Sequence, residues 1–183
     1  MHLDKRSLGQ VADAPALRRL YHAAFPKEEQ MPWWLLRLIS LRQDMGVEGF
    51  YQGDQLRGLT VSVATEAVLF ILFLAVNDEC RGQGWGSAIL NQLKEEYPGR
   101  TILLNVELLD PAAENYHQRL RRMRFYKKNG FFDTGFDIDE VGGTFRVLGT
   151  APQLDVDAYL RVFAKLSFGL WRPYIRKGEH YDL

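Results

Sequence analysis

The stretch LFILFLAVNDECRGQGWGSAILNQLK, residues 69–94, decides the fold of this chain. The apolar run at residues 67–76 predicts a strand that is covered on both faces. Three glycines within five residues follow it, and the apolar residues after them recur at helical spacing. A strand, a glycine-rich turn and a helix start bring together unpaired backbone N–H groups and the positive end of the helix dipole. The stretch therefore predicts a phosphate-binding site.

Two general phosphate-binding motifs can be compared with this loop. A P-loop ends in Gly-Lys-Ser/Thr, whereas this loop ends in Gly86-Ser87 without a lysine, so the P-loop is excluded. Gly82 and Gly84 fit the dinucleotide fingerprint, with Ser87 at the third glycine position. The acidic residue that this fingerprint expects about 20 residues later is Glu107. A Rossmann-type nucleotide-binding protein therefore stays open on spacing alone.

The loop also resembles the signature of an enzyme superfamily. Residues 81–86 match the Arg/Gln-x-x-Gly-x-Gly/Ala motif of the GNAT superfamily of acyl-CoA-dependent N-acetyltransferases. The sequence FYKKNGF at residues 125–131 resembles that family's final helix-to-strand junction and follows at the expected separation. The two motifs span about 65 residues, and two motifs in the right order are more specific than either alone. This resemblance is stronger than the match to the dinucleotide fingerprint.

The resemblance implies an α/β fold with a mixed, centrally splayed β-sheet flanked by helices, and the chain adds a C-terminal helix. We expect one domain, residues 1–183, with residues 155–183 as a C-terminal helical extension. Expected strands cover residues 2–8, 46–53, 56–65, 68–76, 101–107, 131–138 and 143–148. A first helix is expected after Asp13, which is placed as its cap, and extends to Ala24. Further helices are expected at residues 33–42, 86–97, 110–128 and 156–170. The last helix either pads the sheet or forms the face of a homodimer.

The resemblance assigns the cofactor site to acetyl-CoA. It implies that the backbone of the loop wraps the pyrophosphate, through Arg81, Gly82, Gln83, Gly84, Trp85, Gly86 and Ser87. It also implies that the main chain of Leu74 and Val76 pairs with the pantetheine arm like an added strand. Many members carry a cofactor-binding asparagine where this chain has Arg119, and Asn115, one turn earlier, is the candidate substitute.

Tyr126 stands where many GNAT enzymes keep a tyrosine that protonates the departing CoA thiolate. The alternative is an aromatic residue that only packs on the helix face. An acceptor amine must lose a proton before it attacks the thioester, and Glu107 is the first candidate for the base. Glu28 and Glu29 are the second candidates, and a water relay without a single base would leave the same sequence.

The acceptor site is expected in the region between the first two helices, which borders that site in GNAT proteins. Its candidate residues are Glu28, Glu29, Trp33 and Trp34. Core packing is the alternative for the two tryptophans. The histidines show no metal-ligand spacing, so we expect no metal.

Composition narrows the partners. The 23 basic and 23 acidic residues balance, so no global field favours nucleic acid. Six cationic residues of one expected helix are predicted to form a solvated face: Arg119, Arg121, Arg122, Arg124, Lys127 and Lys128. The alternative is that one or two of them contact the phosphates of CoA. The lone Cys80 fits a reducing cytosol, and the longest apolar run of ten residues is too short to cross a membrane. We therefore expect a cytoplasmic protein.

Taken together, these features predict an N-acetyltransferase that passes an acetyl group directly from acetyl-CoA to a primary amine. The acceptor, a small molecule or a peptide, cannot be chosen from the sequence. A non-catalytic acyl-CoA-binding sensor is the alternative from a different functional class.

Overall fold

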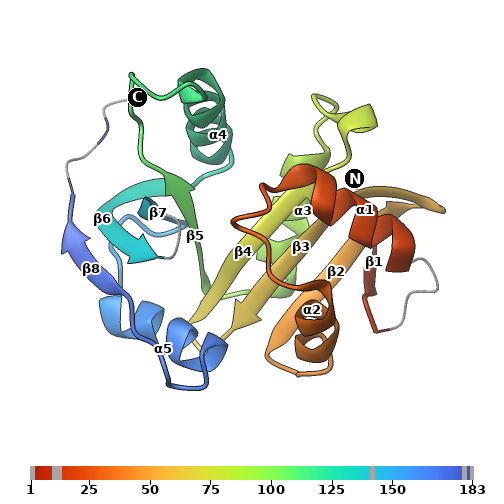
Figure 1. Cartoon of the computed structure of the whole chain (residues 1–183), viewed down its shortest axis with the longest axis horizontal. Coiled ribbons are helices and arrows are strands. Elements are labelled where there is room, and N and C mark those ends of the chain that lie inside the picture. Colours follow the sequence, from red (N-terminus) through yellow and green to blue (C-terminus); the bar gives the residue numbers. More distant parts are fainter. Residues whose placement is uncertain (1–2, 10–13, 141–142, 179–180, 182–183) are drawn as a thin grey trace. The chain divides into compact units, whose positions relative to one another are not determined.

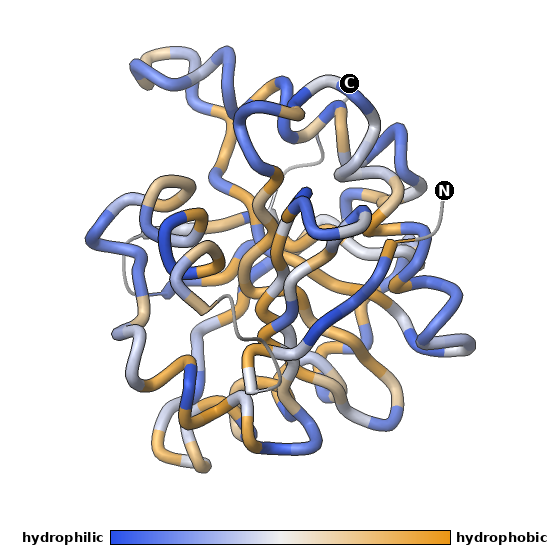
Figure 2. The backbone as a smooth tube through the Cα atoms, turned by 90° about the vertical axis from the view of Figure 1, so that its right-hand side faces the viewer, coloured by the Kyte–Doolittle hydropathy of each residue, from blue (hydrophilic) through white to orange (hydrophobic). Residues whose placement is uncertain are grey.

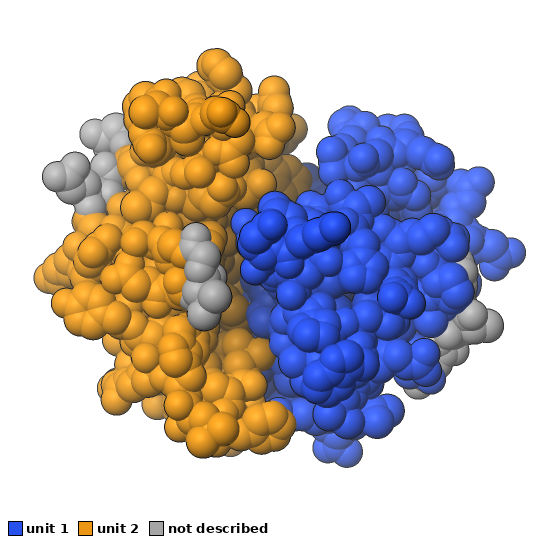
Figure 3. Space-filling model, viewed as in Figure 1, with its two compact units in different colours: residues 1–64, 71–98 blue, residues 65–70, 99–183 orange. Residues whose placement is uncertain are grey.

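The computed structural model describes residues 3–9, 14–140, 143–178 and 181. The chain forms two compact units: unit 1 comprises residues 1–64 and 71–98, and unit 2 comprises residues 65–70 and 99–183 (Figure 3). The described residues contain five α-helices and eight β-strands, and within each unit the strands pair antiparallel (Figure 1). The mixed α/β class is therefore confirmed, while the single domain and the central splay stay predictions.

Unit 1 holds the N-terminal elements and the glycine loop. In chain order these are β1 (Asp4–Ser7), α1 (Ala14–Ala24), α2 (Trp33–Ile39), β2 (Met45–Gln52), β3 (Gln55–Ala64), most of β4 (Val68–Val76), a short 3-10 helix (Asp78–Cys80) and α3 (Trp85–Glu96). β2 and β3 form the predicted hairpin, which turns at Gly53 with φ +60°. The predicted cap of α1, Asp13, lies outside the described residues.

Helices α1 and α3 cover opposite faces of the β2–β3 hairpin. A Cβ atom built on Gly49 would lie 2.8 Å from the Leu17 side chain of α1, and one built on Gly58 would lie 2.6 Å from Ile89 of α3. Gly49 pairs with Leu59, so these two residues face the same side of the hairpin. Gly58, the neighbour of Leu59, faces the opposite side, because successive residues of a strand alternate between faces. The hairpin therefore lies between two helices, and most of its residues are buried. Hydrophobic stretches alternate with hydrophilic ones along the whole backbone (Figure 2).

Unit 2 holds the second half of the chain. It contains β5 (Thr101–Glu107), α4 (Tyr116–Lys128), β6 (Phe132–Glu140), β7 (Gly143–Gly149), α5 (Val156–Leu166) and β8 (Tyr174–Lys177). Its strands run in the order β5-β7-β6-β8. The bounds predicted for β4 and β5 are correct, and the predicted hairpin of β6 and β7 is present, although its tip residues Val141 and Gly142 lie outside the described residues.

Helix α5 pads its own unit. Its side chains Tyr159 and Phe163 pack against Phe70 at ring-centroid distances of 5.7 Å and 5.5 Å. The Tyr159 hydroxyl also donates to Asn105 Oδ1 of β5 at 2.7 Å. This face of α5 is buried, so the helix pads its own unit, and the role of the C-terminal region as a dimer face stays a prediction.

Helices α4 and α5 differ most from their predicted bounds, and β8 was not predicted. Helix α4 begins at Tyr116 instead of residue 110, because the Asp110 carboxylate accepts the N–H of Ala112 at 2.9 Å and holds the chain in a turn. Helix α5 ends at Leu166, shortly before Gly169 with φ +78°. Strand β8 then pairs with β6, so residues 155–183 are not wholly helical.

Candidate functional site

The glycine loop leaves an open backbone in unit 1. Gly82 and Gly84 have φ values of +77° and +88°, a conformation that favours glycine. A Cβ atom added at either position would meet no other protein atom within 4 Å. Gly84 is the N-cap of α3, whose first N–H groups have no intrahelical partner. The loop therefore has the backbone shape that the sequence predicted for an anion site.

Side chains of the loop hold it in this shape. The Gln83 carbonyl oxygen accepts the indole N–H of Trp85 at 3.2 Å, and its amide group donates to the Glu79 carbonyl at 3.4 Å. The Arg57 guanidinium of β3 lies 4.9 Å from the centre of the Trp85 ring. Arg81 forms an exposed ion pair with Asp78 at 2.6 Å. The side chains of Gln83 and Trp85 thus bond within the loop segment, which leaves the loop backbone for a ligand.

The other predicted cofactor residues of unit 1 are Leu74, Val76 and Ser87, all of them half-buried. Leu74 and Val76 are among the last three residues of strand β4 before the loop, and Ser87 lies in the first turn of helix α3. Their placement on one strand–loop–helix segment agrees with the order of the predicted motif. Their role in binding a ligand stays a prediction.

The predicted acceptor residues of unit 1 differ in burial. Glu28 and Glu29 are exposed in the turn between α1 and α2. Trp33 is half-buried, and its ring lies 6.1 Å from that of Tyr21, so it belongs to an aromatic cluster of the core. Trp34 is 67% exposed, which excludes core packing for that residue. The two tryptophans therefore need separate tests.

Tyr126 lies on the buried face of α4 in unit 2. Its side chain is 8% exposed, and its ring packs against Phe131 at 5.5 Å and Phe125 at 5.2 Å. Burial raises the pKa of the Tyr126 hydroxyl to about 12, although the nearby charge of Arg122 acts in the opposite direction. The Tyr126 hydroxyl is therefore protonated at neutral pH. At this pH it can donate a hydrogen bond but does not give up its proton completely.

Glu107, at the end of β5, is bound by three side chains of α4 and its N-cap. Arg122 Nη1 lies 2.6 Å from Oε2, Arg119 Nη2 lies 3.2 Å from Oε1, and the Asn115 amide donates to Oε1 at 3.0 Å. Burial alone would raise the pKa of Glu107, but the Asn115 hydrogen bond and the two arginine charges outweigh it and lower this pKa. Glu107 is therefore a charged anchor for α4.

The same cluster occupies Asn115, the candidate substitute for the family's cofactor asparagine. Its side-chain oxygen accepts Arg119 Nε at 2.6 Å, while its amide binds Glu107. Both ends of the Asn115 side chain are thus used within unit 2. Arg119, which departs from the family pattern, contacts Glu107 of a different element, and no local sequence pattern indicates this contact.

Three further features of the described residues concern metal ligands, membrane-spanning helices and the cysteine. No group of three or more His, Cys, Asp or Glu side chains that could hold a metal ion occurs among these residues. Within the same residues, no helix is long and apolar enough to span a membrane. Cys80 is buried, and its thiol donates to the Asn77 carbonyl at 3.3 Å.

Comparison with known proteins decides between the families that the loop allows. The model of the acetyltransferase (GNAT) domain matches residues 35–132, more than half of the chain. The chain belongs to the GNAT family. It is therefore an acyltransferase, and the Rossmann alternative is excluded. No curated protein sequence matches the chain significantly.

Solved structures share the GNAT fold. A putative GNAT-family acetyltransferase from Bacteroides thetaiotaomicron superposes with a TM-score of 0.73 at 20% identity, covering 93% of this chain and all of its own. An aminoglycoside 6′-N-acetyltransferase complexed with coenzyme A has a TM-score of 0.62 at 16% identity, covering 85% of this chain and 100% of its own. The ribosomal-protein alanine N-acetyltransferase from Escherichia coli has a TM-score of 0.58 at 17% identity, covering 83% and 95%. At these identities the similarity establishes the fold of this GNAT acetyltransferase and not its acceptor.

Proposed function

We propose that this GNAT acetyltransferase transfers an acetyl group directly from acetyl-CoA to a primary amine. The open glycine loop at the start of α3 is the observation that carries the proposal. Backbone N–H groups without a partner and a helix N-terminus attract the pyrophosphate of CoA, and Gly82 and Gly84 leave room for its close approach. The GNAT structures with bound coenzyme A support the choice of ligand.

The state of the only cysteine supports a direct transfer. An acyl-enzyme would need an activated nucleophile, and a cysteine thiolate is the usual one for a thioester. Cys80 is buried with its thiol hydrogen-bonded to a backbone carbonyl, so it is not activated. The amine nitrogen would therefore attack the thioester carbonyl itself, and the C–S bond would break. The thiolate would leave and would then be protonated to the thiol.

Tyr126 is the proposed donor to this thiolate. A CoA thiol has a pKa of about 8.5, so complete proton transfer from a hydroxyl with a pKa of about 12 would be uphill by about 5 kcal/mol. The useful contribution is a hydrogen bond that strengthens as negative charge develops on sulfur. The proton that finally neutralises the thiolate then comes from the acceptor nitrogen, which loses it through the surrounding solvent after the neutral amine has attacked the carbonyl carbon.

Glu107 is a weak candidate for the base. Three donors occupy its oxygens, and its lowered pKa makes it a poorer proton acceptor than an ordinary glutamate. We therefore propose that Glu107 holds α4, which carries Tyr126, and that the amine loses its proton to a water relay. Exposed Glu28 and Glu29 are the protein groups proposed to attract the cationic amine, together with Trp33 and Trp34 at the acceptor site.

The acceptor class is an amine on a small molecule or a peptide. The names of the similar enzymes cover both, an aminoglycoside and an alanine of a ribosomal protein. A free-thiol release assay with acetyl-CoA and a panel of such amines tests the function. Amine-dependent release identifies an enzyme with this activity, whereas tight acetyl-CoA binding without turnover of any amine would favour the non-catalytic sensor.

A further inference from the structure

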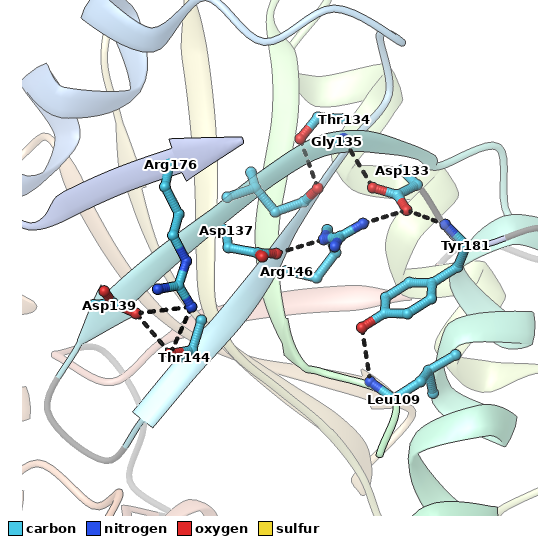
Figure 4. A network of polar contacts seen from close by, with 11 residues as sticks. Leu109, Asp133, Thr134, Gly135, Asp137, Asp139, Thr144, Arg146, Arg176 and Tyr181 are labelled. Carbon is cyan, nitrogen blue, oxygen red and sulfur yellow. Dashed lines mark hydrogen bonds and ion pairs between the residues drawn. The ribbon is translucent and has the colours of Figure 1, made fainter. Parts of the chain in front are cut away.

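A buried ionic network joins β6 and β7 in unit 2. Arg146 of β7 is 1% exposed, and its Nε lies 2.7 Å from Asp137 Oδ1 while its Nη1 lies 2.7 Å from Asp133 Oδ2 (Figure 4). A buried guanidinium is tolerated only when such partners satisfy it. The two aspartates of β6 therefore fix the position of Arg146.

The C-terminal tail beyond β8 docks on this network. The Tyr181 N–H donates to Asp133 Oδ2 at 3.1 Å, and the Tyr181 ring lies over the Arg146 guanidinium at 4.5 Å from its centre (Figure 4). Gly178 donates its N–H to the Gly135 carbonyl at 2.9 Å. A Cβ atom on Gly178 would lie 2.3 Å from Asp137 Oδ2, so the tail backbone passes directly against the buried charges. The backbone and the ring of Tyr181 are thus both held against this network.

The Tyr181 hydroxyl reaches a different part of unit 2. It accepts the backbone N–H of Leu109 at 3.1 Å (Figure 4). Leu109 belongs to the irregular segment, residues 108–115, that connects β5 to α4. The residue before it, Leu108, accepts Arg119 Nη1 through its carbonyl at 2.8 Å. The start of this segment is thus held by the tail on one side and by α4 on the other.

The same segment begins directly after Glu107 and ends at Asn115. Arg119, which binds the Leu108 carbonyl, also binds Glu107 and Asn115. A shift of residues 108–109 would therefore move Arg119 and change its contacts with Glu107 and Asn115, which anchor α4 to β5. Tyr126 lies on the buried face of the same helix, two turns after Arg119.

We propose that Tyr181 is a positioning residue of the acetyltransferase, which fixes the β5–α4 connection and through it the helix that carries Tyr126. The proposal rests on the function proposed above. Tyr181 lies outside residues 35–132, the part that the family model matches, so this role is an addition of the C-terminal tail to the family domain. Tyr181 touches no reacting atom and acts through Leu109 and the Glu107 cluster.

The test compares two tyrosines of the C-terminal region. Tyr181→Phe keeps the ring over Arg146 and removes only the acceptor of the Leu109 N–H. Tyr174→Phe is the matched control, because Tyr174 of β8 is 67% exposed. We expect Tyr181→Phe to raise amide hydrogen exchange at Leu109 and to lower kcat by about fivefold, the factor that corresponds to one hydrogen bond of about 1 kcal/mol. The Kd for acetyl-CoA and the Tm should stay close to those of Tyr174→Phe.

Three outcomes would overturn the proposal. Unchanged exchange at Leu109 in Tyr181→Phe would show that the hydroxyl does not hold this segment. Faster exchange with an unchanged kcat, when chemistry is rate-limiting, would leave Tyr181 a purely structural residue, as would a loss of Tm without a loss of kcat. If the wild-type protein turned over no amine at all, the proposed function would fail, whereas exchange at Leu109 would still judge the Tyr181 contact.

Discussion

Arg122 Nη1 lies 2.6 Å from Glu107 Oε2 and ties α4 to the end of β5. The same arginine is the charged group that acts on the Tyr126 hydroxyl. One ion pair therefore connects the first base candidate of the sequence with the proposed donor to the thiolate. Because of this contact, we propose that Glu107 positions α4 and does not act as the base.

Glu107→Gln should reveal this anchoring role through pH. The folded-state pKa of Glu107 is lowered, so its stabilisation is complete above the unfolded value of 4.5 and disappears as the pH falls through the lower folded value. We expect a loss of unfolding free energy of about 1–2 kcal/mol at pH 7 that shrinks towards pH 3. Denaturant unfolding at several pH values measures it, with exposed Glu114→Gln as the control.

The effect of Glu107→Gln on turnover separates anchor from base. Loss of a general base typically lowers the rate ~10²–10⁴-fold. An anchor that shifts α4 should lower kcat by only about tenfold, since a charge-assisted hydrogen bond contributes about 1.5 kcal/mol. A decrease of a thousandfold or more in a folded variant would restore Glu107 as the base.

Tyr126→Phe tests the donor. The ring contacts with Phe125 and Phe131 remain, and only the hydroxyl is removed. We expect kcat to fall ~10²–10³-fold, because one preorganised donor is lost, while the Kd for acetyl-CoA and the Tm change little. Tyr116→Phe, half-buried at the start of the same helix, is the control and should keep its kcat. Equal kcat values for wild type and Tyr126→Phe, with chemistry rate-limiting, would make Tyr126 a packing residue.

Trp33 and Trp34 should respond differently to truncation. Trp34→Ala removes an exposed ring, so we expect an increase in the KM for the amine and an unchanged Tm. Trp33→Ala opens the aromatic cluster around Tyr21 and should lower the stability by about 3 kcal/mol. Leu41→Ala, 75% exposed, controls for the loss of an exposed apolar side chain. Amine KM values that are the same for Trp34→Ala and Leu41→Ala would remove Trp34 from the acceptor site.

Local sequence signals predicted β4, β5 and the glycine loop correctly. β4 has the predicted bounds because it is a continuous run of apolar residues followed by polar ones, and β5 has them because its largely apolar residues lie between the turn at Pro98-Gly99 and the polar end at Glu107. Gly82 and Gly84 adopt the positive φ values that only glycine favours, so their spacing was sufficient to locate the loop. The family assignment from this loop is confirmed by the domain match.

Contacts between distant residues could not be predicted in this way. The Glu107 cluster depends on where α4 begins, and that is set by the turn at Asp110 and not by apolar periodicity. Strand β8 is short and polar, and it forms because β6 offers it an edge. The contact of Tyr181 with Leu109 joins residues 72 positions apart, and no local pattern marks either of them.

The open glycine loop is proposed to bind acetyl-CoA for transfer of its acetyl group to an amine. The most direct measurement is amine-dependent thiol release by the wild-type protein, Gly84→Ala and Gly99→Ala. Both glycines have positive φ and open space around a Cβ atom, so the two substitutions carry a similar backbone strain, and only Gly84 belongs to the loop. We predict release by wild type and Gly99→Ala and a loss of at least about tenfold in kcat/KM for acetyl-CoA in Gly84→Ala. Equal kcat/KM values for the two variants, or no release with any amine by the wild-type protein, would contradict the account.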